Sequence, residues 1–315
     1  MRKVILIPII IGAVTLTAGA VIFSVGIARQ VKYNQAKPAL SIDVNETYHN
    51  FNIDVSTADL YFTPSTDGTT KVEVIELEKQ THEVTVNEDT LYIKYKDERK
   101  WYEKIFSFGR MKITISMPVA SYSNLKIESD TGNINMPNDF TFDAANIELS
   151  TGDINFKAKV NNEIVFKSST GDMRLDSVDA KSMDLSMSTG KCYLKDVNVT
   201  EKIKVNASTG DISLTNVTAN DLESKSSTGK VTLTNSVITN HIAIKTSTGD
   251  IKFNDSDAAT LKINSDTGDV RGTLLTEKIF YAHSHLGTVR VPTSTTGGLC
   301  EIDTDTGDII ITIKA

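Results

Sequence analysis

A short motif built around glycine recurs through most of the chain. Ser-Thr-Gly-Asp, or a close relative of it, appears ten times, with successive glycines 19 or 20 residues apart. Nine steps of such regular length indicate a repeat protein in which each unit packs on its neighbours. The ten glycines are Gly132, Gly152, Gly171, Gly190, Gly210, Gly229, Gly249, Gly268, Gly287 and Gly307.

Apolar and polar residues alternate on both sides of each glycine. Around Gly210, Ile203 and Val205 come before the glycine, and Ile212 and Leu214 come after it. A period of two indicates β-strands with one buried and one exposed face. Neither strand of a repeat can bury its apolar face alone. We therefore predict an all-β fold, a β-solenoid of about ten rungs of 19–20 residues, with the glycine at a turn that needs positive φ.

Residues 38–118 alternate in the same way but lack the glycine motif. The segment 54–62 resembles a rung in which alanine replaces glycine, and 71–77, 84–86, 91–95 and 112–117 favour strands. We expect a β-rich N-terminal cap over 38–118 that covers the first edge of a repeat domain at 119–315. No C-terminal cap is evident, so that edge is either covered by the chain or open to a partner.

The first 37 residues form a separate segment. Val4–Ile27 holds 24 residues without a charge, about 36 Å as a helix and enough to cross a hydrocarbon core of ~30 Å. A cleaved signal peptide is the alternative, with Ala18-Gly19-Ala20 as its small-residue site. Because the apolar run continues beyond that site, we expect one transmembrane helix in the cell membrane, with the β domain facing outward.

The charge of the chain limits its partners. Its net charge is −7, and because residues 1–37 carry five basic and no acidic residues, residues 38–315 carry −12. An acidic body repels phosphate backbones, so nucleic acid is excluded as a partner. It also repels anionic lipid and teichoic acid unless a divalent cation bridges them.

The motifs together resemble a known family. An apolar N-terminal segment, a strand at Met111–Pro118 and the repeated Ser-Thr-Gly-Asp-Ile are similar to the putative-adhesin family of bacterial β-strand-repeat envelope proteins, the LiaG-like domain of unknown function. The resemblance covers about residues 40–315. It implies an outward-facing β-solenoid, often associated with envelope-stress systems, and supplies no catalytic residues. The chain departs from the pattern at Ala282–Thr288, where rung nine loses the motif.

Carboxylates follow the glycine in most rungs. Asp153 and Asp172 fall on neighbouring rungs, as do Asp250 and Asp269, so each pair lies within ~5 Å. Such pairs could hold Ca²⁺, which takes six to eight oxygen ligands. The favoured interpretation is that each Asp accepts amides of its own turn, with two lysines in the column relieving the repulsion. We expect no cofactor, with a weak Ca²⁺ site as the alternative.

Two surface features are candidates for partner binding. Three residues after the glycine, Lys252, Arg271 and Arg290 would form a short basic ladder, either a contact for an anionic glycan or protein or a solvated face. The insert 97–110 could dock on a partner or on the membrane interface, or fold down as part of the cap. Its candidate contact residues are Trp101, Tyr102, Ile105 and Phe106.

Histidine and cysteine offer little chemistry. His283 and His285 could face one side, but zinc needs further ligands, so surface histidines are the favoured interpretation. Cys192 and Cys300 occupy core columns six rungs apart, about 29 Å at the spacing of paired strands. A disulfide needs Cα atoms within ~7 Å, so we predict two free, buried cysteines.

An uninterrupted repeat favours binding over catalysis. A polysaccharide-cleaving enzyme needs paired carboxylates and a loop that breaks the repeat at one place, whereas no step here exceeds 20 residues. We expect a non-enzymatic, membrane-anchored extracellular module, an adhesin or an envelope-binding scaffold that uses many weak contacts with cell-wall or surface glycan or protein. The alternative is an accessory or sensory subunit that contacts a membrane protein of an envelope-stress system. An enzyme trails both.

Overall fold

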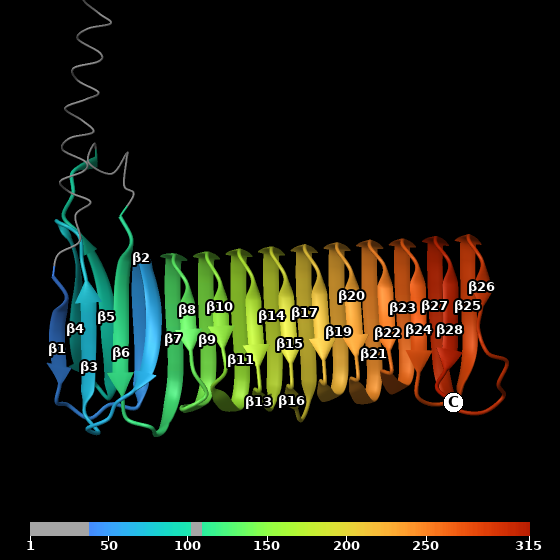
Figure 1. Cartoon of the computed structure of the whole chain (residues 1–315), viewed down its shortest axis with the longest axis horizontal. Coiled ribbons are helices and arrows are strands. Elements are labelled where there is room, and N and C mark those ends of the chain that lie inside the picture. Colours follow the sequence, from blue (N-terminus) through green and yellow to red (C-terminus); the bar gives the residue numbers. More distant parts are fainter. Residues whose placement is uncertain (1–37, 102–108) are drawn as a thin grey trace, which may run out of the picture.

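The computed structural model describes residues 38–101 and 109–315, which form a long, straight stack of β-strands (Figure 1). In these two ranges, no helix is long and apolar enough to span a membrane. The predicted anchor at 1–37, and with it Tyr102, Ile105 and Phe106 of the insert, lies outside the described residues.

Each rung places one strand before its glycine and one after it, on two faces of the stack. The strands before the glycine are β7 (Ser121–Thr131), β9 (Thr141–Thr151), β11 (Lys159–Thr170), β14 (Ser182–Thr189), β17 (Lys202–Thr209), β19 (Thr218–Thr228), β21 (Val237–Thr248), β23 (Asp257–Thr267), β25 (Lys278–Leu286) and β27 (Gly298–Thr306). The strands after it are β8 (Ile134–Met136), β10 (Ile154–Phe156), β12 (Met173–Asp176), β15 (Cys192–Lys195), β18 (Ile212–Thr215), β20 (Val231–Thr234), β22 (Ile251–Asn254), β24 (Val270–Leu274), β26 (Val289–Arg290) and β28 (Ile309–Ile313). Two short strands, β13 (Asp179–Ala180) and β16 (Asn198–Val199), lead into the first face.

Neighbouring rungs pair in parallel, with like columns in register. Leu185, Val205 and Ser224 lie side by side on one face, and Cys192, Ile212 and Val231 on the other. The inward side chains are almost fully buried in one continuous core. This register confirms the solenoid that the period-two pattern predicted.

The two cysteines lie in this core as free thiols, as predicted. Burial raises the pKa of each thiol to about 12, so neither forms a thiolate readily. The spacing differs from the prediction, because the rung of Cys300 stacks directly on that of Leu261. The two cysteines are therefore five rungs apart in the stack, not six.

Two turn columns hold the rungs together. At the first, Gly210 has φ +137°, and a Cβ there would lie 1.7 Å from the carbonyl oxygen of Gly190. Glycine is therefore required both by its backbone conformation and by the close approach of the next rung. At the second column, Asp196, Asn216 and Asn235 adopt φ between +49° and +54°, where Asn and Asp are the best tolerated side chains.

The region before the repeats builds further rungs and an antiparallel edge. β2 (Asn50–Pro64) pairs in parallel with β7 and β8, with Ala58 where a glycine would stand, as predicted. β5 (Thr90–Asp97) and β6 (Met111–Met117) pair in parallel with the other side of β2. β1 (Leu40–Val44), β3 (Thr70–Ile75) and β4 (Gln80–Asn87) then add in antiparallel orientation.

The C-terminal end does not follow chain order. β27 lies between β23 and β25, and β28 lies between β24 and β26. The last rung of the chain is therefore inserted between rungs eight and nine. A buried ion pair holds the crossover, with Lys278 Nζ 2.9 Å from Asp257 Oδ1 and the two side chains 2% and 6% exposed. The expectation that rungs stack in sequence is wrong at this end.

Candidate binding surfaces

The aspartates after the glycines connect one rung to the next. Asp153 Oδ1 accepts a hydrogen bond from the amide of Asp172 (2.8 Å), and Asp172 Oδ1 accepts one from the amide of Lys191 (2.9 Å). The expectation that each Asp binds amides of its own turn is therefore corrected, since the amide belongs to the following rung. We call this column, residues 59, 133, 153, 172, 211, 250, 269 and 308 with their acceptor bonds, the turn ladder.

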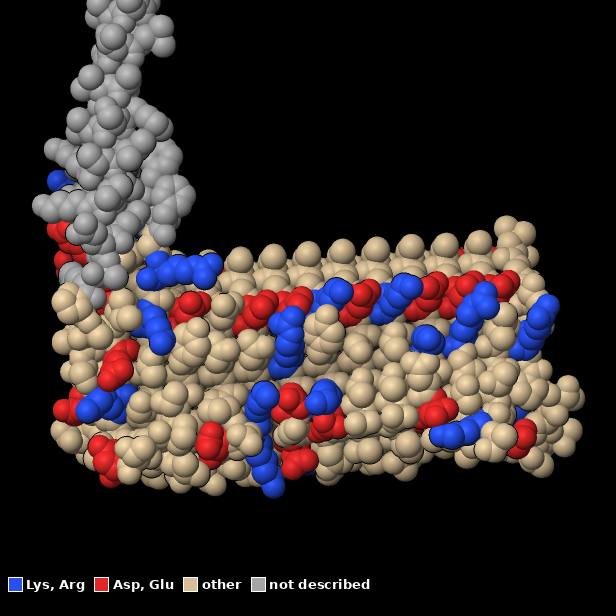
Figure 2. Space-filling view, viewed as in Figure 1, with Lys and Arg blue, Asp and Glu red and all other residues tan. Residues whose placement is uncertain are grey.

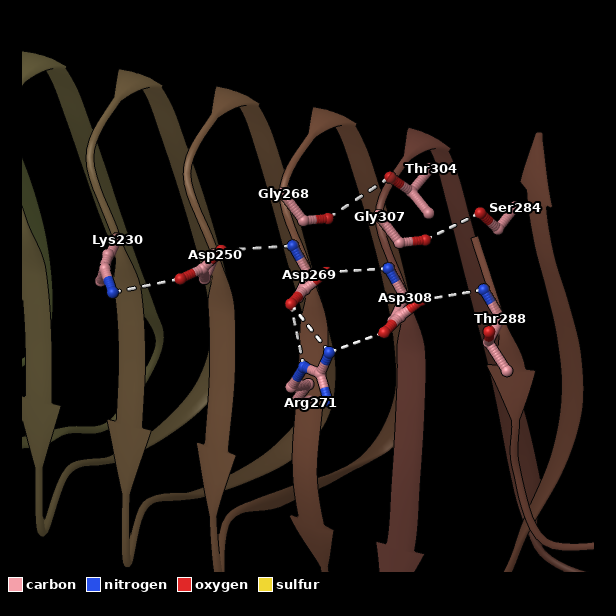
Figure 3. A network of polar contacts seen from close by, with 10 residues as sticks. All are labelled: Lys230, Asp250, Gly268, Asp269, Arg271, Ser284, Thr288, Thr304, Gly307 and Asp308. Atoms are coloured by element: carbon pink, nitrogen blue, oxygen red, sulfur yellow. Dashed lines mark hydrogen bonds and ion pairs between the residues drawn. The ribbon is translucent and has the colours of Figure 1, made fainter. Parts of the chain in front are cut away.

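Basic side chains bind the second carboxylate oxygens of the ladder. Arg174 contacts Asp172 Oδ2 at 2.5 Å and Asp153 Oδ2 at 3.4 Å. Further along, Arg271 bridges Asp269 and Asp308 (Figure 3). The hydrogen bond from the Asp308 amide, and to a lesser extent the contact with Arg271, hold the pKa of Asp269 below its usual value. Figure 2 shows the resulting row of acidic and basic side chains along the stack.

The candidate calcium ligands already take part in contacts of the turn ladder. Asp250 Oδ2 lies 3.1 Å from Lys230 Nζ, while its Oδ1 faces the amide of Asp269 at 3.3 Å. Within residues 38–101 and 109–315, no group of three or more His, Cys, Asp or Glu side chains is placed to hold a metal ion. The weak Ca²⁺ site at Asp153, Asp172, Asp250 and Asp269 stays a prediction.

The predicted basic ladder is interrupted by the change in rung order. Lys252 pairs in register with Arg271. Arg271 and Arg290, however, both pair with Ile310, which therefore lies between them. Arg271 is also engaged by two carboxylates of the turn ladder. A partner could therefore contact Lys252 and Arg271 as neighbours, but Arg290 would form a separate contact.

The insert 97–110 of the cap begins and ends at a turn of the stack. It connects β5 to β6, where other rungs make their glycine turn. Trp101 is 77% exposed at its start, and Tyr102, Ile105 and Phe106 lie outside the described residues. Partner binding by this insert therefore stays a prediction.

A shallow groove of about 570 Å³ runs across six rungs of the face that precedes the glycines. We call it the serine groove, because one wall is the serine column two residues before each glycine. The opposite wall lies four residues before the glycine and includes Lys167, Ser186, Asn206, Lys225 and Lys245. The serine column is Ser150, Ser169, Ser188, Ser208, Ser227 and Ser247.

The chemistry of the serine groove depends on the buried side chains beneath it and on two lysines that form no ion pair. Ser168, Ala207 and Ser226 lie beneath it, in a buried column that also holds the larger Leu149 and Met187. Lys225 is paired with Glu223, whereas Lys167 and Lys245 form no ion pair among the described residues. The groove therefore offers hydroxyl groups along one side, and along the other two lysines without an ion pair together with Glu148, which lies beside Lys167.

Toward the cap, the same face becomes acidic. A neighbouring hollow of about 700 Å³ shares Glu148 and Ser150 with the groove and is also lined by Asp54, Glu128 and Asp130. The face thus runs from carboxylates at the cap to lysines at the middle of the stack. A ligand that spans both would meet opposite charges at its two ends.

The serine groove is not predicted by the apolar core columns of the sequence. Its signal was present in the sequence, since six successive rungs carry serine two residues before the glycine. No apolar or aromatic pattern marks that column, and single exposed serines are common on protein surfaces.

The family model of Toastrack DUF4097 matches residues 48–202 and again residues 193–315. The two matches meet in the middle of the stack and together take in nearly all the described residues. Among curated proteins, no sequence matches the chain.

Three solved structures are similar in architecture. A putative adhesin from Bacteroides fragilis is 18% identical, with 88% of this chain and 98% of that chain covered and a TM-score of 0.43. A putative adhesin from Parabacteroides merdae is 12% identical, with 76% and 96% covered and a TM-score of 0.47. A putative lipid binding protein from Parabacteroides distasonis is 13% identical, with 87% and 97% covered and a TM-score of 0.47. Similarity at this level says nothing about what the present chain binds.

Proposed function

We propose that this chain, which belongs to the Toastrack DUF4097 family, is a non-enzymatic, adhesin-like module that binds an extended, hydroxyl-rich glycan of the cell envelope. The serine groove is the observation that carries the proposal. It is long and shallow, and serine and lysine supply most of its lining residues, unlike the deep apolar pocket that usually encloses a small molecule.

The periodic walls of the groove suit a periodic ligand. Successive serine hydroxyls repeat at the rung spacing of about 4.8 Å, so a linear polymer meets the same donor and acceptor many times. No aromatic side chain lines the groove to stack on sugar rings, so each contact is weak. Affinity then depends on the number of contacts made at once, as in multivalent binding. Lys167 and Lys245 favour a polymer with some negative charge.

The location that we propose is the outer face of the cell membrane, with Val4–Ile27 as a single transmembrane helix. The cap would then lie next to the anchor, and the stack of rungs would carry the serine groove away from the membrane. The acidic body works against broad adsorption to anionic surfaces, which leaves the groove as the place for a selective contact.

Retention on isolated cell walls of the producing organism tests the proposal. The full-length chain, purified in mild detergent, is mixed with washed walls, and the bound fraction is measured with and without EDTA. We expect retention that persists in EDTA and falls at least about tenfold in affinity when Lys167 and Lys245 are both changed to Glu. The matched control is Lys159→Glu, an exposed lysine on the same strand as Lys167 but outside the groove.

Each result separates the alternatives. Retention abolished by EDTA would move the site from the groove to the aspartates of the turn ladder, as bridging Ca²⁺ ligands. Retention unchanged in the double variant, or absent from the wild-type chain, would contradict the groove.

A second candidate function rests on the exposure of Trp101 at the insert. An accessory subunit of an envelope-stress system would use this insert to contact a membrane protein. Trp101→Ala with Phe106→Ala would then abolish the stress response and leave wall retention intact, whereas the groove variants would do the opposite.

A further inference from the structure

The outermost rung at the C-terminal end presents an unpaired edge. β25 pairs only with β27, and β26 only with β28, in the part of the chain that the structure describes. The outer N–H and C=O groups of both strands therefore have no strand beside them. Such an edge is a template for strand addition unless something blocks it.

The core also continues to the surface at this edge. Val289 is 39% exposed, whereas its register partner Ile309, one rung inward, is fully buried. Phe280 and Ala282 are only partly buried, although Cys300 and Ile302 beside them are 0% and 1% exposed. Apolar columns buried in every interior rung are thus left open to solvent at the last one.

β25 lacks the features that normally protect a strand edge, whereas β26 is followed closely by Pro292. The outward positions of β25 hold Ile279, Tyr281, His283 and His285, without an acidic side chain, a lysine, an arginine or a proline. Tyr281 and Leu286 are 68% and 70% exposed. The inward Lys278 does not block the edge, because Asp257 neutralises it in the interior. Arg290 is the one charged residue of β26.

We infer that two copies of this chain join through these ends, with β25 of one copy antiparallel to β25 of the other. The occupant must supply an extended strand together with apolar columns at the spacing of a rung, and a second terminal rung supplies both. At the opposite end of the molecule, β1 and β4 also pair on one side only among the described residues, but these outer strands carry the charged residues Asp43 and Glu83 and so suit strand addition less well. A two-fold axis across the strands brings the outward rows of the two β25 strands together, and neither row contains a lysine, an arginine or an acidic residue.

Crosslinking of the full-length chain in mild detergent tests the inference. Tyr281→Cys is treated with a short bis-maleimide, with Lys262→Cys as the matched control. Lys262 lies in the same outward column two rungs inward, and the native cysteines are buried. We expect a covalent dimer from Tyr281→Cys and none from Lys262→Cys. Equal crosslinking of both variants, or of neither, would overturn the inference.

A second variant asks whether the edge itself drives association. Tyr281→Lys places an ammonium group in the outward row of each β25, so we expect self-association to weaken about tenfold or more by sedimentation, with an unchanged melting temperature of the dilute monomer. A wild-type chain that stays monomeric, or a dimer insensitive to Tyr281→Lys, would contradict the two-copy interface. Crosslinking of Tyr281→Cys in cells to a different protein, without a homodimer, would also contradict it.

Discussion

Asp269 Oδ1 accepts a hydrogen bond from the backbone amide of Asp308 at 2.8 Å, although the two residues are 39 positions apart. The residue expected there from chain order, Thr288, instead donates its amide to Asp308 Oδ1 at 2.9 Å (Figure 3). The same type of bond thus recurs wherever the column carries Asp or Asn, and at the C-terminal end it links rungs out of chain order. Among the described residues, no further rung offers an amide to the outermost rung, so Thr288 at this position leaves no amide without an acceptor.

The glycine column is predicted to be the least tolerant part of the fold. Gly210→Ala requires φ +137° and brings a Cβ to 1.7 Å from the carbonyl oxygen of Gly190. We expect a loss of about 3 kcal/mol or more in the free energy of unfolding, measured by urea denaturation. Gly68→Ala is the control, since it shares a positive φ but has nothing within 4 Å, and it is expected to cost about 1 kcal/mol. Equal losses would contradict the stacking argument.

The turn ladder predicts a difference between two substitutions at one position. Asp172→Ala removes the acceptor for the amide of Lys191, so we expect the free energy of unfolding to fall by about 1–2 kcal/mol. Asp172→Asn keeps an acceptor oxygen and loses only the charge that pairs with Arg174, a half-exposed contact, so about 0.5 kcal/mol or less is expected. Thermal melts of both variants measure the difference, and an Asn variant as unstable as the Ala variant would contradict the amide role.

The buried ion pair at the crossover is predicted to hold the terminal rungs. Lys278→Met leaves the carboxylate of Asp257 buried without its cation, and we expect a loss of about 3–5 kcal/mol. Hydrogen exchange should show the loss first in β25 and β27. Lys262→Met, which removes an exposed pair with Glu301, should change stability by less than about 1 kcal/mol. Unchanged protection of β25 in Lys278→Met would show that the pair does not fasten the crossover.

The contacts of Glu223 predict that the stability of the fold decreases at acidic pH. Hydrogen bonds from Lys202 and then Lys225 lower the pKa of its carboxyl to about 2. The unfolded chain has the higher value of ~4.3, so the stabilisation is complete above about pH 5 and is lost as the pH falls toward 2. Melting temperatures between pH 2 and 6 should fall less steeply in Glu223→Gln than in the wild type. The control Glu201→Gln, at an exposed site, should follow the wild-type curve.

Much of the fold could be predicted because the repeat fixes it column by column. Alternation around Gly210 identified the buried residues Ile203, Val205, Ile212 and Leu214, and the spacing fixed the parallel register. The missing glycine at Ala58 did not hide its rung, because the flanking apolar positions kept the same phase.

The order of the last rungs could not be predicted, since every rung carries the same columns and each fits on any other. The information lies in a few residues outside the repeat, chiefly Asp257 and Lys278, which hold the chain where it passes over a rung. The partners of the aspartates were assigned to their own turn because local amides are near in sequence, whereas the amide of the next rung is nearer in space. The serine groove could not be predicted because the serine column has no apolar or aromatic pattern to mark it, and exposed serines are common on protein surfaces.

The most direct test of the groove is the dependence of affinity on ligand length. From Ser150 to Ser247, six serines span five rung steps, about 24 Å at ~4.8 Å per rung. Wall glycan fragments graded by length are titrated into the full-length chain by calorimetry. If many weak contacts along the groove carry binding, affinity rises with length until the fragment spans about 24 Å and then levels off. A short fragment that binds as tightly as a long one would show a single discrete site and contradict the account.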